Sequence, residues 1–99
     1  MNMKERCLVT DKVSVEGKKI GYMYREQPYN IPNDSGWRFF EGTEDEDYIN
    51  DPENSTAYTL EEVINMDNSI KPFLDSPYGS SYYKDKDGNF IEENNGEDY

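Results

Sequence analysis

The chain has 99 residues, of which 33% are apolar, 14% are aromatic and 22 are Asp or Glu, giving a formal net charge of −12. This length specifies one domain with a modest core, because so short a chain buries roughly 60 to 65% of the surface that its unfolded form exposes. The negative charge excludes binding that depends on phosphate contacts, so we expect neither nucleic acid nor an anionic membrane as partner.

The charge is distributed unevenly. Residues 1–40 hold seven Lys or Arg and five Asp or Glu, and residues 41–99 hold three against seventeen, so the two parts carry +2 and −14. A strongly acidic surface attracts basic proteins and speeds their encounter. The alternative is that the charge serves solubility alone.

Nothing in the sequence indicates an oxidising compartment or a membrane. Cys7 is the only cysteine, so no internal disulfide forms. No apolar run approaches the roughly 20 residues that span a bilayer, and the first residues, "MNMKERCLVTDK", lack the apolar stretch of a signal peptide. We therefore expect a cytoplasmic protein, and the sequence does not specify its oligomeric state.

Apolar alternation predicts extended structure in the first part of the chain. "RCLVT" is rich in β-formers, and "KVSV" alternates Val13 with Val15 before the turn residues of "EGKK". In "KIGYMYRE" the side chains of Ile20, Tyr22 and Tyr24 fall on one face at a period of two. This segment is the clearest strand in the chain.

A loop and a second clear strand follow. Residues 27–36, "QPYNIPNDSG", contain two prolines and several turn formers. We expect residues 34–36 to form a turn that begins the strand "WRFFEG", in which Trp37 and Phe39 share a face and form core. The polar segment 43–55 comes next, and "STAYTL" after it predicts a short strand.

One helix has a sequence signature. Thr59 with Glu62 makes a capping box, and Leu60, Val63 and Ile64 follow at helical spacing. The helix is expected to be short, because Asp, Asn and Pro residues soon interrupt the pattern. "IKPFLDSPYG" predicts a second helical turn that covers the sheet.

The end of the chain predicts a hairpin. Asp87 and Gly88 form a favoured pair for a tight β-turn between "SYYK" and "NFIE". Residues 94–99 lack a core former, so we expect a flexible acidic tail after a single domain of residues 1–93. The predicted fold class is α+β, with a small, mostly antiparallel sheet and one or two short helices packed on it.

The residue types needed for catalysis are scarce. The chain contains no histidine, which removes the commonest general base and metal ligand. Cys7 lies in a predicted apolar strand, where a small buried side chain is a better interpretation than a nucleophile. We therefore expect no enzymatic activity and no cofactor.

Two stretches resemble calcium loops and fail at particular positions. With Gly88 at position 6 of an EF-hand loop, Tyr83 and Asn94 occupy the first and last ligand positions. With Asp45 at position 1, Ile49 falls at position 5. No metal site is predicted, and weak calcium binding by clustered carboxylates is kept as an alternative.

Tyrosine, which is enriched at protein interfaces, lies beside the acids. The acidic segment can be interpreted either as a solvated loop or as a docking face for a partner, and both interpretations are kept. The candidate partner-binding residues are Tyr29, Asp34, Glu44, Asp45, Glu46, Asp47, Tyr48 and Asp51.

Three segments resemble, in order and spacing, a small bacterial domain of unknown function that is grouped with the immunity proteins of polymorphic toxin systems, as immunity protein family 33. They are "GYMYRE", "DSGWRFFEGTEDEDYIND" and "EEVINMDNSIKPFLDSPYGSSYYKD", within roughly residues 7–93. The most specific part runs from the turn at Asp34 through Trp37 and Phe40 to Tyr48.

The resemblance implies a small α+β domain that binds and neutralises a cognate toxin, and it implies no catalytic residues. The acidic part of the chain suggests a basic toxin, as nucleases are basic because they bind phosphate. The alternative is a housekeeping or regulatory interaction module that has no toxin partner.

Overall fold

The computed structural model describes residues 2–29 and 31–93, so the tail predicted at 94–99 lies outside the described residues. In this part of the chain six strands form one sheet in the order β4-β1-β3-β2-β5-β6. The strands are β1 (Arg6–Thr10), β2 (Tyr22–Arg25), β3 (Asp34–Phe40), β4 (Ser55–Thr59), β5 (Ser81–Lys84) and β6 (Phe90–Glu92). Strands β1 and β3 are parallel and the other four pairings are antiparallel, so the sheet is mixed and the predicted α+β class is confirmed.

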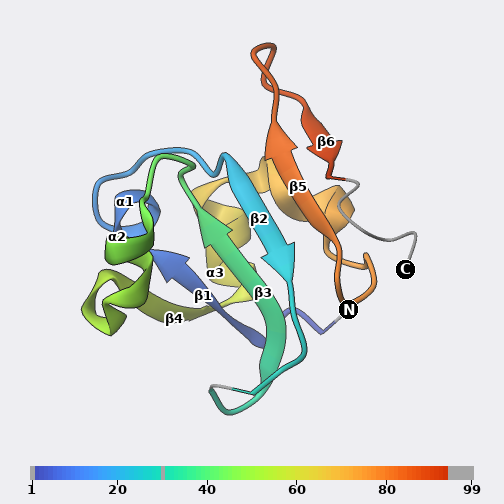
Figure 1. Cartoon of the computed structure of the whole chain (residues 1–99). Helices are drawn as coiled ribbons and strands as arrows, with labels where there is room; N and C mark the ends of the chain where they lie inside the picture. The colour runs from blue at the N-terminus through green and yellow to red at the C-terminus, as the bar shows by residue number, and fades with distance from the viewer. Residues whose placement is uncertain (1, 30, 94–99) are drawn as a thin grey trace.

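Short helices are divided between one face of the sheet and one edge. They are α1 (Asp11–Ser14), α2 (Glu46–Asn50) and α3 (Leu60–Met66), with the 3₁₀ helices η1 (Pro52–Asn54) and η2 (Asn68–Phe73). Helices α3 and η2 lie behind the sheet in Figure 1, whereas α1 and α2 lie at its left edge. The face toward the viewer is therefore open over β2 and β3.

The capping box predicted for α3 is present. The Thr59 hydroxyl accepts from the Glu62 N–H at 3.2 Å, and the Glu62 carboxylate accepts from the Thr59 N–H at 2.8 Å. The helix ends at Met66, and the N–H of the next residue, Asp67, donates to the Val63 carbonyl. The Asp67 carboxylate then accepts from the Ser69 N–H at 3.1 Å and caps η2. Two short helical segments therefore cover the rear face of the sheet, as predicted.

The core lies between this rear face and the two helical segments. Trp37 and Phe39 are fully buried, with ring centroids 5.8 Å apart, and the Trp37 indole N–H donates to the Leu74 carbonyl at 3.1 Å. Cys7 is also fully buried. Both sequence-based predictions, of a Trp37–Phe39 core and of a buried cysteine, are confirmed. The hairpin joining β5 and β6 and the short strand β4 are confirmed as well.

The expectation of extended structure at "KVSV" is wrong. The chain turns into α1 directly after Thr10, where Val15 and Glu16 both donate N–H groups to the Asp11 carbonyl. The β4 register ends with Thr10 opposite Ser55, so the chain beyond Thr10 has no strand to pair with. Local hydrogen bonds close a helical turn instead.

The face predicted for Ile20 is also wrong. Strand β2 begins at Tyr22, and Ile20 is fully buried with the core while Tyr22 and Tyr24 lie on the other face. The Ile20 N–H donates to the Asp67 carboxylate at 2.9 Å, which holds this residue against the rear layer. The period of two therefore breaks before the strand begins.

Residues 34–36 belong to β3 and do not form a separate turn. The β1–β3 register shifts between Arg6 and Leu8, which places a β-bulge at the start of β3. Gly36 takes φ +89°, and a Cβ on it would approach the Glu26 carbonyl oxygen. This close backbone approach requires glycine, so the turn-forming sequence specifies a bulge within the strand.

Candidate partner-binding surface

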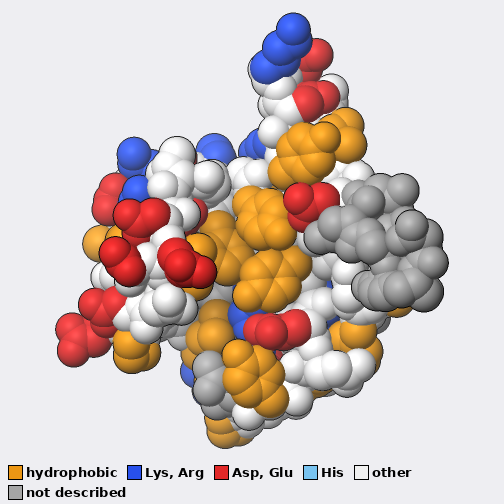
Figure 2. Space-filling model, viewed as in Figure 1, with side chains coloured by type: hydrophobic (Ala, Val, Ile, Leu, Met, Phe, Trp, Pro, Cys, Tyr) orange, Lys and Arg blue, Asp and Glu red, His pale blue; other side chains and the backbone are white. Residues whose placement is uncertain are grey.

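One row of aromatic and apolar side chains crosses the open face of the sheet. Strand pairing sets Phe40 opposite Tyr22, Tyr22 opposite Tyr83, and Tyr83 opposite Ile91. Tyr24 lies beside this row, with its ring stacked at 5.5 Å and 18° on that of Phe40. We call these five side chains the open face; Figure 2 shows the apolar side chains gathered at the centre of this view.

Strand alternation explains why these residues share one face. In β2, Met23 points to the core and its neighbours Tyr22 and Tyr24 point away from it. In β3, Trp37 and Phe39 are core residues, so Phe40 lies on the opposite face. Tyrosine suits this position because its ring packs on neighbours while its hydroxyl can find a polar partner, as that of Tyr22 does by donating to the Glu93 carboxylate at 3.2 Å.

A groove lies between the open face and the α2–η1 segment. It consists of a hollow of about 380 Å³ and an adjoining one of about 220 Å³. Tyr24, Phe40 and Ile49 line both hollows, and Pro52 of η1 lines the larger. Apolar side chains from two separate parts of the chain thus form the walls.

An ion cluster contributes Arg38 and Glu26 to the lining of the larger hollow. The Arg38 guanidinium donates to both Asp34 oxygens, at 3.0 and 2.8 Å, and to one Glu26 oxygen at 2.6 Å. The side chains of Arg38 and Asp34 are 3% and 1% exposed, whereas that of Glu26 is 30% exposed. One cation faces two carboxylates, so the cluster carries net negative charge.

Hydrogen bonds in this cluster overcome the cost of burial. Burial alone would raise the pKa of Asp34, but the bonds from Arg38 and from the Gly36 N–H outweigh it and lower this pKa to about 2. Burial would likewise lower the pKa of Arg38, but its bonds to Asp34 and Glu26 raise it. Asp34 and Arg38 are therefore both charged at neutral pH.

Glu44 joins the acidic segment to the sheet. One of its oxygens accepts from the Thr10 hydroxyl at 2.7 Å and from the Glu41 N–H at 2.8 Å, and the other accepts from the Gly42 N–H at 2.8 Å. Burial raises its pKa, but these bonds outweigh it and the net shift is downward. Glu44 also lines the smaller hollow, so it is both a structural anchor and a wall of the groove.

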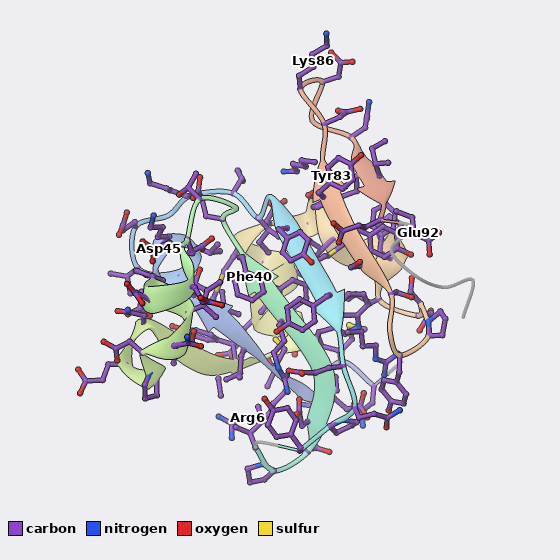
Figure 3. All side chains as sticks on the ribbon, in the orientation of Figure 1. Arg6, Phe40, Asp45, Tyr83, Lys86 and Glu92 are labelled. Carbon is purple, nitrogen blue, oxygen red and sulfur yellow. The ribbon has the colours of Figure 1, made fainter. Side chains whose placement is uncertain are left out.

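The remaining acids surround α2. Asp45 caps this helix by accepting from the Tyr48 N–H at 2.8 Å, and Asp51 caps η1 by accepting from the Glu53 N–H at 3.0 Å. Glu46 and Asp47 are exposed in the first turn of α2. In Figure 3, Asp45 lies at the left of the sheet, Phe40 at its centre and Tyr83 on the hairpin side.

The structure brings two of the sequence-predicted residues to the groove: Tyr29 lines the larger hollow, 5.7 Å from the Arg38 guanidinium, and Glu44 lines the smaller one. Asp34 lines neither hollow, but it pairs with Arg38, which lines the larger one. The other five lie on α2 or at its two ends: Asp45, Glu46, Asp47, Tyr48 and Asp51. Their binding to a partner stays a prediction.

Sequence reasoning did not identify the open face as a site. Tyr22 and Tyr24 were recognised as a strand face, but nothing local indicates that β3 and β5 would continue this face with Phe40 and Tyr83. Two sequence patterns could have indicated the open face: tyrosine alternates with Met23 in β2, and aromatic residues fall on both faces of the strand "WRFF".

The side chains of this surface are suited to contacts with a partner, and few of them have the chemistry of a catalytic group. The chain has no histidine, and burial raises the pKa of Cys7, whose thiol donates to the Tyr58 carbonyl. Over residues 2–29 and 31–93, no three Cys, Asp or Glu side chains are grouped so as to hold a metal ion. No helix in the same ranges is long and apolar enough to cross a membrane.

A small α+β domain with an uncovered aromatic sheet face beside acidic side chains has the surface of a protein-binding domain. The chain belongs to the family of the immunity protein Imm33 domain, whose family model matches residues 7–94. This match confirms the family resemblance and supports an immunity-protein role. Comparison with curated proteins gives no match, and comparison with solved structures gives none.

Proposed function

We propose that the chain neutralises a cognate protein toxin by binding it, without catalysing a reaction. Family membership supports the immunity role. The observation that carries the binding mode is the open face, where Tyr83 and Ile91 are 43% and 38% exposed and continue the row of Tyr22 and Phe40. A contiguous, partly exposed patch of aromatic and apolar side chains on so acidic a domain fits a protein partner.

The toxin in this proposal is basic. The chain carries a net charge of −12, and exposed carboxylates of α2 lie beside the groove. Glu46 and Asp47 would accelerate encounter with a cationic protein, while the rings of the open face would hold it once docked. We place this action in the cytoplasm, where an immunity protein would protect the cell that makes it.

Co-expression tests this function. The C-terminal domain encoded by the reading frame directly upstream in the host genome would be induced in a bacterial cell with and without this chain. We expect growth arrest without the chain and growth with it, and purification of one protein should recover the other. An unrelated toxin of similar charge serves as the control, because an immunity protein should not rescue cells from it.

Two results would contradict the proposal. One is growth arrest that persists although the chain is expressed and folded. The other is an upstream protein that is harmless and does not bind the chain, which would favour an interaction module without a toxin.

A further inference from the structure

We propose that the groove between the open face and α2 receives a lysine or arginine side chain from the partner. In this arrangement the cationic head lies against the Tyr24 ring and pairs with Glu26, and the stem lies along Ile49. The inference rests on the proposed function for the partner's identity as a toxin, but the chemistry of the groove is independent of it.

Among the described residues no cation is stacked over a ring of the open face, although Arg38 lies opposite Tyr24 in the β2–β3 pairing. Three tyrosines elsewhere each lie within cation–π distance of a basic side chain of the same chain. The pairs are Tyr29 with Arg38 at 5.7 Å, Tyr48 with Lys12 at 5.4 Å and Tyr78 with Arg25 at 4.4 Å. Across the described ranges, no Lys or Arg lies over the ring of Tyr22, Tyr24 or Phe40. Phe40 is only 7% exposed and its ring stacks on that of Tyr24, so an outside cation can reach the part-exposed rings of Tyr22 and Tyr24.

The groove also provides an available carboxylate. Glu26 contacts Arg38 through Oε2 alone, and its other oxygen has no hydrogen-bond partner among the described residues. Arg38 is already neutralised by Asp34 and Glu26, so it does not repel an incoming cation strongly. Arg6, which is the basic residue of the neighbouring strand β1, lines neither hollow. The local charge therefore favours a positive group.

The shape of the groove suits one long amphipathic side chain. Its larger hollow, about 380 Å³, is at the small end of the roughly 300–1,000 Å³ typical of ligand sites. Leu8, Ile49 and Pro52 offer apolar contact to a methylene stem, while Glu26 lies on the wall. Lysine and arginine combine such a stem with a charged head.

Other side chains fit less well. An acidic group would face the ion cluster, which has net negative charge, and Glu44 of the adjoining hollow. A purely apolar side chain would remove water from the Glu26 carboxylate without replacing the lost hydrogen bond. A cation can lie against the Tyr24 ring and pair with the Glu26 carboxylate at the same time, so the groove favours it over the other two kinds of side chain.

A peptide titration of the complete, ¹⁵N-labelled chain tests this inference without the toxin. The probe is a short peptide of alternating arginine and serine, added at low salt and followed by amide chemical shifts. Peptides with glutamate or leucine in place of arginine are the comparison probes. We expect saturable shifts in β2, β3 and α2 with the arginine peptide, and weaker binding at high salt.

Matched variants separate the groove from general charge attraction. Tyr24→Leu should weaken arginine-peptide binding more than Tyr24→Phe does, by roughly two- to fivefold, because only the leucine variant loses the ring. Glu26→Gln should weaken it at least roughly threefold. Glu61→Gln removes one charge from α3 on the rear face and should have a smaller effect. Amide spectra of each variant establish that it is folded.

Three outcomes would overturn the inference. They are no saturable binding of the arginine peptide at low salt, equal affinity of the Leu and Phe variants at Tyr24, and tighter binding of the leucine peptide. A failed co-expression rescue with positive peptide results would instead refute the immunity function and leave the cation groove standing. A successful rescue with negative peptide results would refute the groove alone.

Discussion

Asp34→Asn tests the ion cluster beside the groove. Asn keeps an acceptor for Arg38 and the Gly36 N–H but removes the charge that two guanidinium bonds require. The pKa of Asp34 falls from 3.8 to about 2 on folding. At about 1.36 kcal/mol per pKa unit, this shift stabilises the ionised protein by roughly 2 to 3 kcal/mol. The Asp34 side chain is 1% exposed, so solvent screening reduces this value little.

The sign of the pH dependence follows from the lowered pKa. The stabilisation from Asp34 is fully present above its unfolded-state pKa, near 4, and is lost as the pH falls toward about 2. The free energy of unfolding of the wild type should therefore fall more steeply between about pH 5 and pH 2 than that of Asp34→Asn. At pH 7 the variant should be less stable by about 2 to 3 kcal/mol.

Urea denaturation followed by Trp37 fluorescence measures these differences. Asp47→Asn is the matched control, because Asp47 is exposed on α2 and its substitution should change stability by less than about 0.5 kcal/mol. Parallel stability curves for wild type and Asp34→Asn across this pH range would refute the reasoning. Equal losses from Asp34→Asn and Asp47→Asn at pH 7 would refute it as well.

Three further predictions address a helix cap, the bulge and the acidic helix. Thr59→Ala removes one side of the capping box and should lower the free energy of unfolding by about 1 kcal/mol, measured by urea titration. An unchanged free energy of unfolding would contradict the stabilising role of the cap. Gly36→Ala should lower the free energy of unfolding by more than about 2 kcal/mol, because φ is +89° and a Cβ would meet the Glu26 carbonyl. A melting temperature equal to that of the wild type would refute this. The double change Glu46→Lys and Asp47→Lys keeps the Asp45 cap, so it should slow toxin association at low salt in surface-binding kinetics and leave stability nearly unchanged. An unchanged association rate would exclude α2 as the steering surface.

Local patterns predicted the elements whose determinants are local. The Thr59 capping box specified the start of α3, and the Asp87–Gly88 pair specified the hairpin. Alternation correctly placed Trp37 and Phe39 in the core. In each case neighbouring residues carry the signal.

Elements that depend on distant partners were not predictable in the same way. The pairing of β1 with β4 stops at Thr10, which lies opposite Ser55, the first residue of β4, and the local alternation of Val13 with Val15 does not indicate this. The parallel pairing of β1 with β3 and the bulge at Gly36 depend on residues far apart in sequence. Long-range pairing therefore decided what local propensity could not.

The same distinction applies to the candidate surface. The acids near Tyr48 are visible in the sequence as a run, and their capping roles follow from local spacing. The open face is assembled from β2, β3, β5 and β6, so its continuity depends on strand order. The groove also requires that α2 lies against the sheet. Glu44, just before this helix, is held to β1 by the hydrogen bond that it accepts from the Thr10 hydroxyl.

Calorimetric titration of the purified cognate toxin tests most directly whether the open face binds it. Tyr83→Ala truncates an exposed ring of the open face, and Glu61→Ala truncates an exposed side chain on α3 at the rear of the sheet. We predict that Tyr83→Ala weakens toxin binding roughly tenfold or more, as loss of an interface aromatic does, while Glu61→Ala changes it little. Unchanged affinity of Tyr83→Ala, or a larger loss in Glu61→Ala, would contradict the assignment of the binding surface.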